Sequence, residues 1–176
     1  MTQPLYRQVL GASFDELPPR VRQLHELTGP TVWRGRADVT RGTSGVARLL
    51  AMLFRLPPDG CDQHIEVRFM PAATHEVWQR VFPSGRFQSR QYASGNRLVE
   101  TVGPLSLVMT PSAAPTGLSL GMNGARLFGI PLPAALVPRI ATREWEQDGR
   151  YRFDVAAGLP LIGALVRYAG WLEPVD

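Results

Sequence analysis

Residues 75–102 read HEVWQRVFPSGRFQSRQYASGNRLVETV and carry the clearest fold signal of the chain. Apolar and polar residues alternate there with the period of a β-strand, in three runs: 75–82, 86–93 and 97–102. The links between the runs, Pro83-Ser84-Gly85 and Ser94-Gly95-Asn96, contain residues that suit tight turns. Short links of this kind join antiparallel neighbours. The stretch therefore predicts three consecutive strands of an antiparallel meander.

The same alternation continues on both sides of this stretch. Further candidate strands are 31–39, 64–70, 104–110, 117–123, 139–147, 150–157 and 165–172. Segment 129–138 contains three prolines, which forbid a continuous strand, and is predicted as a loop with one helical turn. An antiparallel sheet with this many strands must curl, close or split into layers.

Helical patterns precede most of the strands. Residues 1–30 are predicted to be helical, because Val21, Leu24 and Leu27 follow a helix-starting proline pair at helical spacing. His25 falls on the polar side of this helix and is expected to be exposed. Residues 46–56, VARLLAMLFRL, are apolar all round except for two arginines, so this helix is expected to be mostly buried.

These patterns together predict an α+β fold. N-terminal helices and one buried helix would pack on a strongly curved antiparallel sheet or barrel of about eight to nine strands. One domain is expected over 1–176, with a helical segment 1–30, a strand plus buried helix 31–62 and an antiparallel meander 63–176. A curved sheet of this size either encloses a small apolar ligand or is filled by its own side chains, and the sequence leaves both alternatives open.

Composition and charge exclude several function classes. The 19 basic residues are all arginine, which explains the basic character without a nucleic-acid surface. No run of basic residues occurs, so we expect no nucleic-acid partner. Nor do we expect a membrane span, since every apolar stretch is too short. One cysteine, Cys61, and no signal-peptide pattern predict a cytoplasmic protein. The oligomeric state is not indicated.

Common catalytic and metal motifs are missing from the sequence. It contains no G-x-S-x-G, no P-loop, no G-x-G-x-x-G after a strand and no H-E-x-x-H. The three histidines and Cys61 lack the spacing of a metal site. We therefore expect neither a metal nor a cofactor.

Strand 75–82 presents the candidate ligand-binding residues. Trp78, Arg80 and Phe82 share one face, which mixes large apolar groups with a charge. A charge on an apolar face must be paired or have a shifted pKa. We expect Arg80 to pair with Glu100 and its forked guanidinium to anchor a carboxylate or carbonyl of a ligand. A structural salt bridge that closes the sheet is the alternative.

Candidate acid–base groups lie on later strands. Glu100 shares a face with Leu98 and Val102, while Asp154 and Tyr168 lie on strands 150–157 and 165–172. Glu100 or Asp154 would act as acid or base with a pKa raised by burial. Tyr168 or Arg80 would stabilise developing oxyanion charge.

Several short motifs resemble those of a known family. They are Leu5-Tyr6-Arg7, WQRVF (78–82), FQS (87–89), LVETVGP (98–104), GIPLP (129–133), FDV (153–155), LPLIG (159–163) and VRYAGWL (166–172). On these residues nearly the whole chain resembles the bacterial domain-of-unknown-function family 4166. The resemblance brings no assigned activity, but it implies a metabolic, small-molecule context, because the domain also occurs behind nicotinamide-dehydrogenase-like domains. It adds Ser89 to the candidate ligand-binding residues.

Three functions follow as hypotheses. The first is binding of a small, largely apolar or amphipathic molecule in the cavity of the curved sheet or barrel, with helix 46–56 closing one side. The second is a cofactor-independent cyclase, isomerase or hydrolase that uses the same cavity. The third is a protein-interaction domain that uses a sheet edge or the 129–138 loop.

Overall fold

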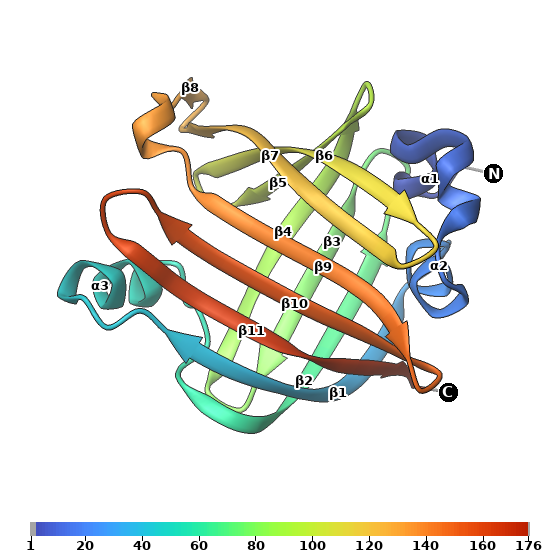
Figure 1. The fold of residues 1–176 in the computed structure, drawn as a ribbon, viewed down its shortest axis with the longest axis horizontal. Helices are drawn as coiled ribbons and strands as arrows, with labels where there is room; N and C mark the ends of the chain where they lie inside the picture. The colour runs from blue at the N-terminus through green and yellow to red at the C-terminus, as the bar shows by residue number, and fades with distance from the viewer. Residues whose placement is uncertain (1–2, 176) are drawn as a thin grey trace.

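An antiparallel β-barrel makes up most of the molecule (Figure 1). The computed structural model describes residues 3–175. Its helices and strands follow in this order: α1 (Leu5–Leu10), η1 (Gly11–Glu16), α2 (Pro19–His25), β1 (Thr31–Arg41), α3 (Gly45–Leu53), β2 (Gly60–Pro71), β3 (Glu76–Phe82), β4 (Gly85–Ser94), β5 (Arg97–Val102), β6 (Leu105–Ala114), β7 (Gly117–Leu127), β8 (Ile130–Pro131), η2 (Ala134–Leu136), β9 (Arg139–Gln147), β10 (Arg150–Leu159) and β11 (Gly163–Pro174).

The barrel closes through pairs of strands that are distant in the sequence. Strands β1 to β7 form a meander in which each pairs with the next, and β9, β10 and β11 form a second one. Strand β11 pairs with β1 and β7 pairs with β9, so ten strands close into a ring and β8 lies outside it against β7. The protein is therefore mostly β. The predicted curved sheet or barrel with N-terminal helices is confirmed. The sheet has more strands than the eight or nine expected, and β8 lies in segment 129–138, which was predicted as a loop.

The expectation that the helix of residues 46–56 is buried is wrong. Helix α3 contacts the barrel through two small residues, Ala47 and Ala51, which are 1% and 0% exposed. Leu49 and Leu53 on its other side are 58% and 71% exposed. A pattern that is apolar all round cannot show which face will be covered, and only the narrow alanine face lies against the strands.

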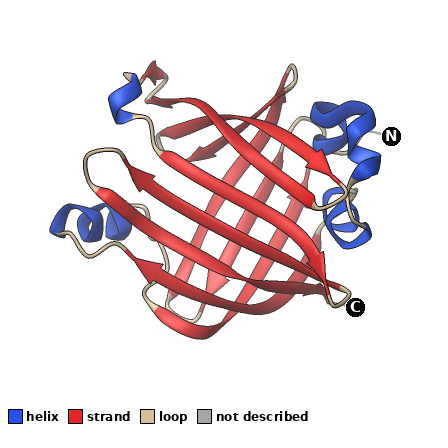
Figure 2. Cartoon of the chain, in the orientation of Figure 1, coloured by secondary structure: helices blue, strands red, loops and turns tan. Residues whose placement is uncertain are grey.

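Helices stand at both ends of the barrel, as Figure 2 shows. α1 and α2 cover one end, whereas α3 lies beside the other (Figure 1). Tyr6, Phe14 and Val21 of the N-terminal segment are fully buried, so this segment forms part of the core. No helix among the described residues is both long and apolar enough to cross a membrane.

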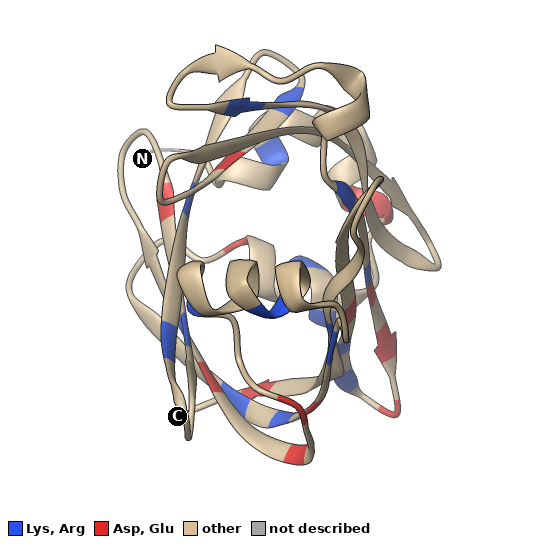
Figure 3. Ribbon diagram, turned by 90° about the vertical axis from the view of Figure 1, so that its left-hand side faces the viewer, with Lys and Arg blue, Asp and Glu red and all other residues tan. Residues whose placement is uncertain are grey.

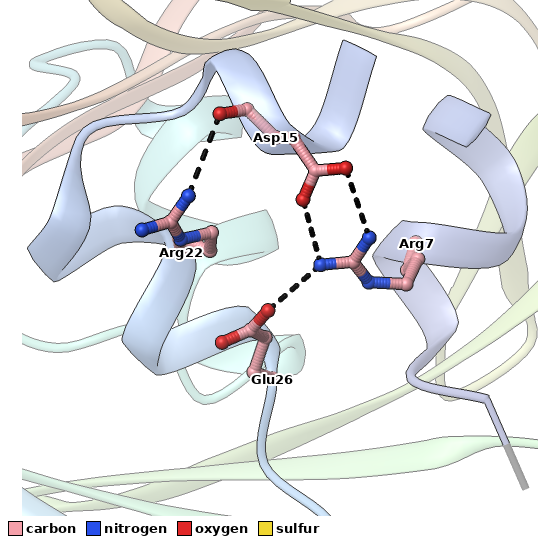
Figure 4. A network of polar contacts seen from close by, with 4 residues as sticks. All are labelled: Arg7, Asp15, Arg22 and Glu26. Atoms are coloured by element: carbon pink, nitrogen blue, oxygen red, sulfur yellow. Dashed lines mark hydrogen bonds and ion pairs between the residues drawn. The ribbon is translucent and has the colours of Figure 1, made fainter. Parts of the chain in front are cut away.

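Ion pairs hold the N-terminal helices to one another (Figure 4). The Arg7 guanidinium donates to both carboxylate oxygens of Asp15, at 2.9 and 3.2 Å, and to Glu26 at 2.9 Å. Arg22 donates to the backbone oxygen of Asp15 at 3.5 Å. These groups are exposed to solvent, so their contribution is mainly to orientation.

Two places where the ring closes have distinctive backbones. Along the β1–β11 pair, the backbones approach so closely at Gly35 and Gly170 that a Cβ on either glycine would collide with a carbonyl of the facing strand. The β7–β9 pair, which we call the β7–β9 seam, is short: only residues 118–120 of β7 pair with 142–144 of β9. Beyond these pairs, the two strands diverge toward the end of the barrel where α3 lies.

Candidate functional site

The barrel encloses a cavity of about 170 Å³. Its wall is predominantly apolar and includes residues from β2, β6, β7, β10 and β11: Ile65, Val67, Leu107, Leu120, Phe153 and Val166. A dry cavity of about 150 Å³ is large enough to bind benzene. Of the two alternatives left open by the sequence, a hollow interior is therefore the one present.

Polar side chains gather where α1 and α2 cover the barrel. The Tyr6 ring lies 3.8 Å from the His25 ring, centroid to centroid, and its hydroxyl donates to Gln91 Oε1 at 3.1 Å. His25 Nε2 lies 2.6 Å from Glu144 Oε2. Tyr6, Gln91 and Glu144 line the cavity, so they form a polar floor beneath its apolar wall.

Arg80 reaches the cavity from β3. Its guanidinium donates to Ser89 Oγ at 3.0 Å and lies 3.7 Å from Glu100 Oε1. The group also sits 5.3 Å from the ring centroids of both Trp78 and Phe87. A guanidinium has five N–H donors. Among the described residues Arg80 makes one side-chain hydrogen bond and one ion pair, so its other N–H groups can donate to a molecule in the cavity.

Four of the predicted site residues line this cavity: Trp78, Arg80, Glu100 and Tyr168. The expected pairing of Arg80 with Glu100 is present. Ser89 stands behind Arg80 as its hydrogen-bond acceptor and does not line the cavity. The structure thus brings together residues from β3, β4, β5 and β11.

Two predicted residues lie elsewhere. Phe82 is buried next to Phe87, with ring centroids 6.4 Å apart, but is not part of the cavity wall. Asp154 points outward, because its neighbours on β10, Tyr151 and Phe153, are the ones that point inward. Arg167 donates to both of its carboxylate oxygens, at 2.6 and 2.9 Å. The predicted acid–base role of Asp154 in the cavity is therefore corrected.

The polar floor was not predicted from the sequence. His25 was expected to be exposed, but it is 1% exposed because its helix packs into the end of the barrel. Glu144 lies in a stretch, TREWEQ (142–147), that is polar on both strand faces, so alternation could not show which face is inside. Tyr6 belongs to the short α1, and no local signal indicates that this helix closes a barrel.

Burial raises the pKa of three tyrosines around the cavity. Loss of hydration is the largest cause for Tyr6, Tyr151 and Tyr168. For Tyr6 and Tyr151 the negative charge of Glu144 adds to it, whereas Arg80 opposes it at Tyr168. All three hydroxyls therefore remain neutral hydrogen-bond donors far above neutral pH.

These tyrosines should make the fold sensitive to alkali. Their folded pKa lies above the unfolded value of 10.0, so the unfolded chain loses these protons first. The stability that the three tyrosines contribute is fully present below the unfolded pKa. Between the unfolded and the folded pKa, each tyrosine lowers the free energy of unfolding by about 1.4 kcal/mol per pH unit. Urea titrations on both sides of that pH, with tyrosinate absorbance as second readout, measure the effect. Ionisation of all three with the fold intact would contradict it.

Comparison with known proteins shows the family to which the chain belongs. A family model described as a domain of unknown function (DUF4166) matches residues 17–172. The match spans the ten barrel strands almost entirely and contains Trp78, Arg80, Glu100 and Tyr168, but leaves out α1 with Tyr6. No curated protein matches the chain. Because the family model covers most of the sequence, the chain belongs to the DUF4166 family.

Proposed function

We propose that the barrel binds a small, largely apolar molecule that carries one uncharged oxygen acceptor, such as a ketone. One observation carries this proposal: the largely buried Arg80 guanidinium lines an apolar cavity and has N–H donors beyond those that face Ser89 and Glu100. A charged group in an apolar surrounding is stabilised by each further hydrogen bond that it makes. A ligand oxygen in the cavity could accept such a bond from Arg80.

The charges around Arg80 favour a neutral head group. Glu100 and Glu144 line the same cavity, and within the described part of the chain Arg80 is the only arginine in its lining. A ligand carboxylate would have to enter beside two carboxylates, whereas a carbonyl or hydroxyl oxygen accepts from Arg80 without that repulsion. Tyr168 lines the cavity too, and its hydroxyl is a further neutral donor.

The ligand's apolar part should determine most of the affinity. Each methylene group transferred from water into the apolar wall contributes about 0.8 kcal/mol, or about fourfold in Kd. The volume of about 170 Å³ suits a compact chain or ring. The proposal therefore predicts a graded dependence on chain length until the cavity is full.

A matched series of eight-carbon compounds tests the proposal. 2-Octanone, 1-octanol, octanoate and octane share the apolar chain and differ in the head group. Calorimetric titration should find 2-octanone or 1-octanol tightest and octanoate weaker, and 2-hexanone should bind about fifteenfold more weakly than 2-octanone. Thermal shift follows the same order, since a ligand specific for the folded state raises its stability.

Variants identify where the compounds bind. Arg80→Met combined with Glu100→Gln removes the anchor without leaving a lone carboxylate, and should bind 2-octanone no better than octane. Asp154→Asn is the matched control, because this carboxylate lies outside the cavity, and it should bind like the unaltered protein. No binding by any member of the series, or binding that ignores Arg80, would overturn the proposal.

Catalysis remains a second hypothesis, favoured by the position of Glu100 beside Arg80 in the cavity. As a general base, Glu100 would take a proton from the carbon next to a ligand carbonyl while Arg80 stabilises the enolate oxygen. In D₂O the carbon would then regain a deuteron. NMR of bound 2-octanone distinguishes the two: exchange that requires Glu100 indicates catalysis, and binding without exchange indicates a carrier.

A further inference from the structure

The end of the barrel opposite α1 and α2 has an unusual surface. It consists of the segments 42–60, 83–86, 102–105, 126–139 and 159–163, which we call the rim; they include α3, β8, η2 and the turns between the strands. Figure 3 looks straight at this end, with α3 in front. All five segments lie together because consecutive strands run in opposite directions.

Helix α3 turns an apolar stripe toward solvent. Val46, Leu49 and Leu53 recur at the spacing of one helix face and are 52%, 58% and 71% exposed. The fully buried residues of this helix are two small ones, Ala47 and Ala51. The helix thus presents its larger side chains to the outside, which is the reverse of what folding alone favours.

Other parts of the rim repeat this arrangement. Phe128 and Ile130 in the β7–β8 turn are 78% and 69% exposed, Leu136 in η2 is 49% exposed, and Leu161 in the β10–β11 turn is 80% exposed. Among the described residues, Val175 is the one large apolar side chain exposed away from the rim. Concentrated exposure of this kind marks an interaction surface.

Phe128 also has a strained backbone. Its φ is 50° and that of Gly129 is 82°, so both central residues of the turn are left-handed. Asn and Gly suit such a turn, whereas a bulky side chain is disfavoured there. Neither the geometry of the turn nor packing therefore accounts for a large apolar residue at its exposed tip.

The rim is also the cationic end of the molecule. Its segments contain five arginines, Arg48, Arg55, Arg86, Arg126 and Arg139, all exposed, and a single acidic residue, Asp59. This excess equals the net charge of +4 of the whole chain. None of the five forms an ion pair with another described residue.

The cavity extends to this end of the barrel. Phe54, Leu56, Leu105 and Pro138 of the rim belong to its lining. They continue the apolar wall from the interior toward the exposed apolar side chains. A molecule that leaves a hydrocarbon phase at the rim would therefore meet apolar surface along its whole way to Arg80.

We propose that the rim docks on an anionic lipid bilayer and that the cavity takes up its ligand from that bilayer. Apolar side chains from three separate segments would enter the lipid, while the unpaired arginines meet anionic headgroups. The docking proposal depends on the rim residues alone. Only the uptake of a ligand rests on the proposed function.

Vesicle sedimentation tests docking with the full chain and no added ligand. Vesicles of phosphatidylcholine mixed with phosphatidylglycerol should carry the protein down at low salt, and vesicles of phosphatidylcholine alone should carry down far less. Arg48→Gln with Arg126→Gln should weaken binding about 25-fold, since each basic residue near the surface contributes about fivefold. Arg90→Gln with Arg97→Gln removes the same charge from exposed positions outside the rim and is the matched control.

Apolar variants separate docking from folding. Leu49→Gln with Phe128→Asn should weaken vesicle binding at least about tenfold, because each side chain loses its burial in lipid. Asn suits a left-handed turn, so this variant should remain at least as well folded as the unaltered protein. Its binding of 2-octanone in vesicle-free buffer should not change, since neither residue lines the cavity.

The possible results of these experiments distinguish docking from ligand binding and from self-association. Sedimentation with anionic vesicles that depends on the rim residues supports docking, whether or not any ketone binds. A chain that binds 2-octanone but not anionic vesicles overturns the docking proposal and leaves the proposed function intact. A dimer in sedimentation velocity that Leu49→Gln converts to a monomer, without vesicle binding, would show that the rim contacts a second copy and would also overturn docking.

Discussion

Replacing Arg80 by Met should lower the free energy of unfolding by about 3–5 kcal/mol, the usual consequence of removing one partner of a buried ion pair. Arg80 and Glu100 are both largely buried, with 11% and 15% of their side chains exposed. The variant leaves the Glu100 carboxylate and the Ser89 hydroxyl in the barrel without their cation. Urea unfolding monitored by circular dichroism measures the loss.

A second substitution distinguishes the effect of the lost charge on stability from the effect of the lost packing. Arg80→Met with Glu100→Gln should recover much of the lost stability, because the remaining carboxylate is then neutral. Arg97→Met, at an exposed position, is the control and should change stability by less than about 0.5 kcal/mol. If the single and the double variants are equally unstable, packing of the arginine stem and not its charge holds this part of the barrel.

Alanine at Gly35 or Gly170 should be at least as damaging, with a loss of about 3 kcal/mol or more or no folded protein at all. A Cβ at either position meets a backbone carbonyl of the facing strand, Trp171 for Gly35 and Arg36 for Gly170. A carbonyl in a strand cannot move away without breaking its ladder, so the first and last strands would separate. The measurement is again urea unfolding, together with the yield of soluble protein.

Gly124→Ala is the matched control for these substitutions. Gly124 also lies in a strand, β7, but a Cβ there would have no neighbour within 4 Å. Alanine should therefore be neutral or stabilise by about 0.4–1 kcal/mol, through the lower entropy of the unfolded chain. Equal losses at Gly124 and Gly35 would mean that strand glycines matter here for flexibility and not for close approach.

Local alternation was enough to predict much of the barrel and part of its cavity. On β3 the period of two puts Trp78 and Arg80 on one face, and a charge on such a face pointed to a partner on a neighbouring strand. That partner, Glu100, lies two strands away on β5, and its side chain meets that of Arg80 on the inner face of the same wall. The inference succeeded because a meander places nearby sequence segments side by side.

Features that depend on contacts between distant segments could not be predicted from the sequence. The same alternation put Asp154 on one face of its strand but could not tell which face is inside. His25 is buried because α2 covers the end of the barrel. Helix α3 is exposed because it contacts the barrel mainly through its narrow alanine face. Arginines scattered singly along the sequence gather at the rim only when the ring closes.

The short β7–β9 seam explains why proline recurs between these strands. Where the strands part, β7 between Gly121 and Gly124 and the start of β9 keep backbone groups that no facing strand occupies. Such edges recruit strands from other molecules and lead to aggregation. Strand β8 covers the tip of β7, and Pro131, Pro133 and Pro138, which have no N–H to offer, stand before β9. The prolines thus limit the pairing of this open edge with strands of other molecules.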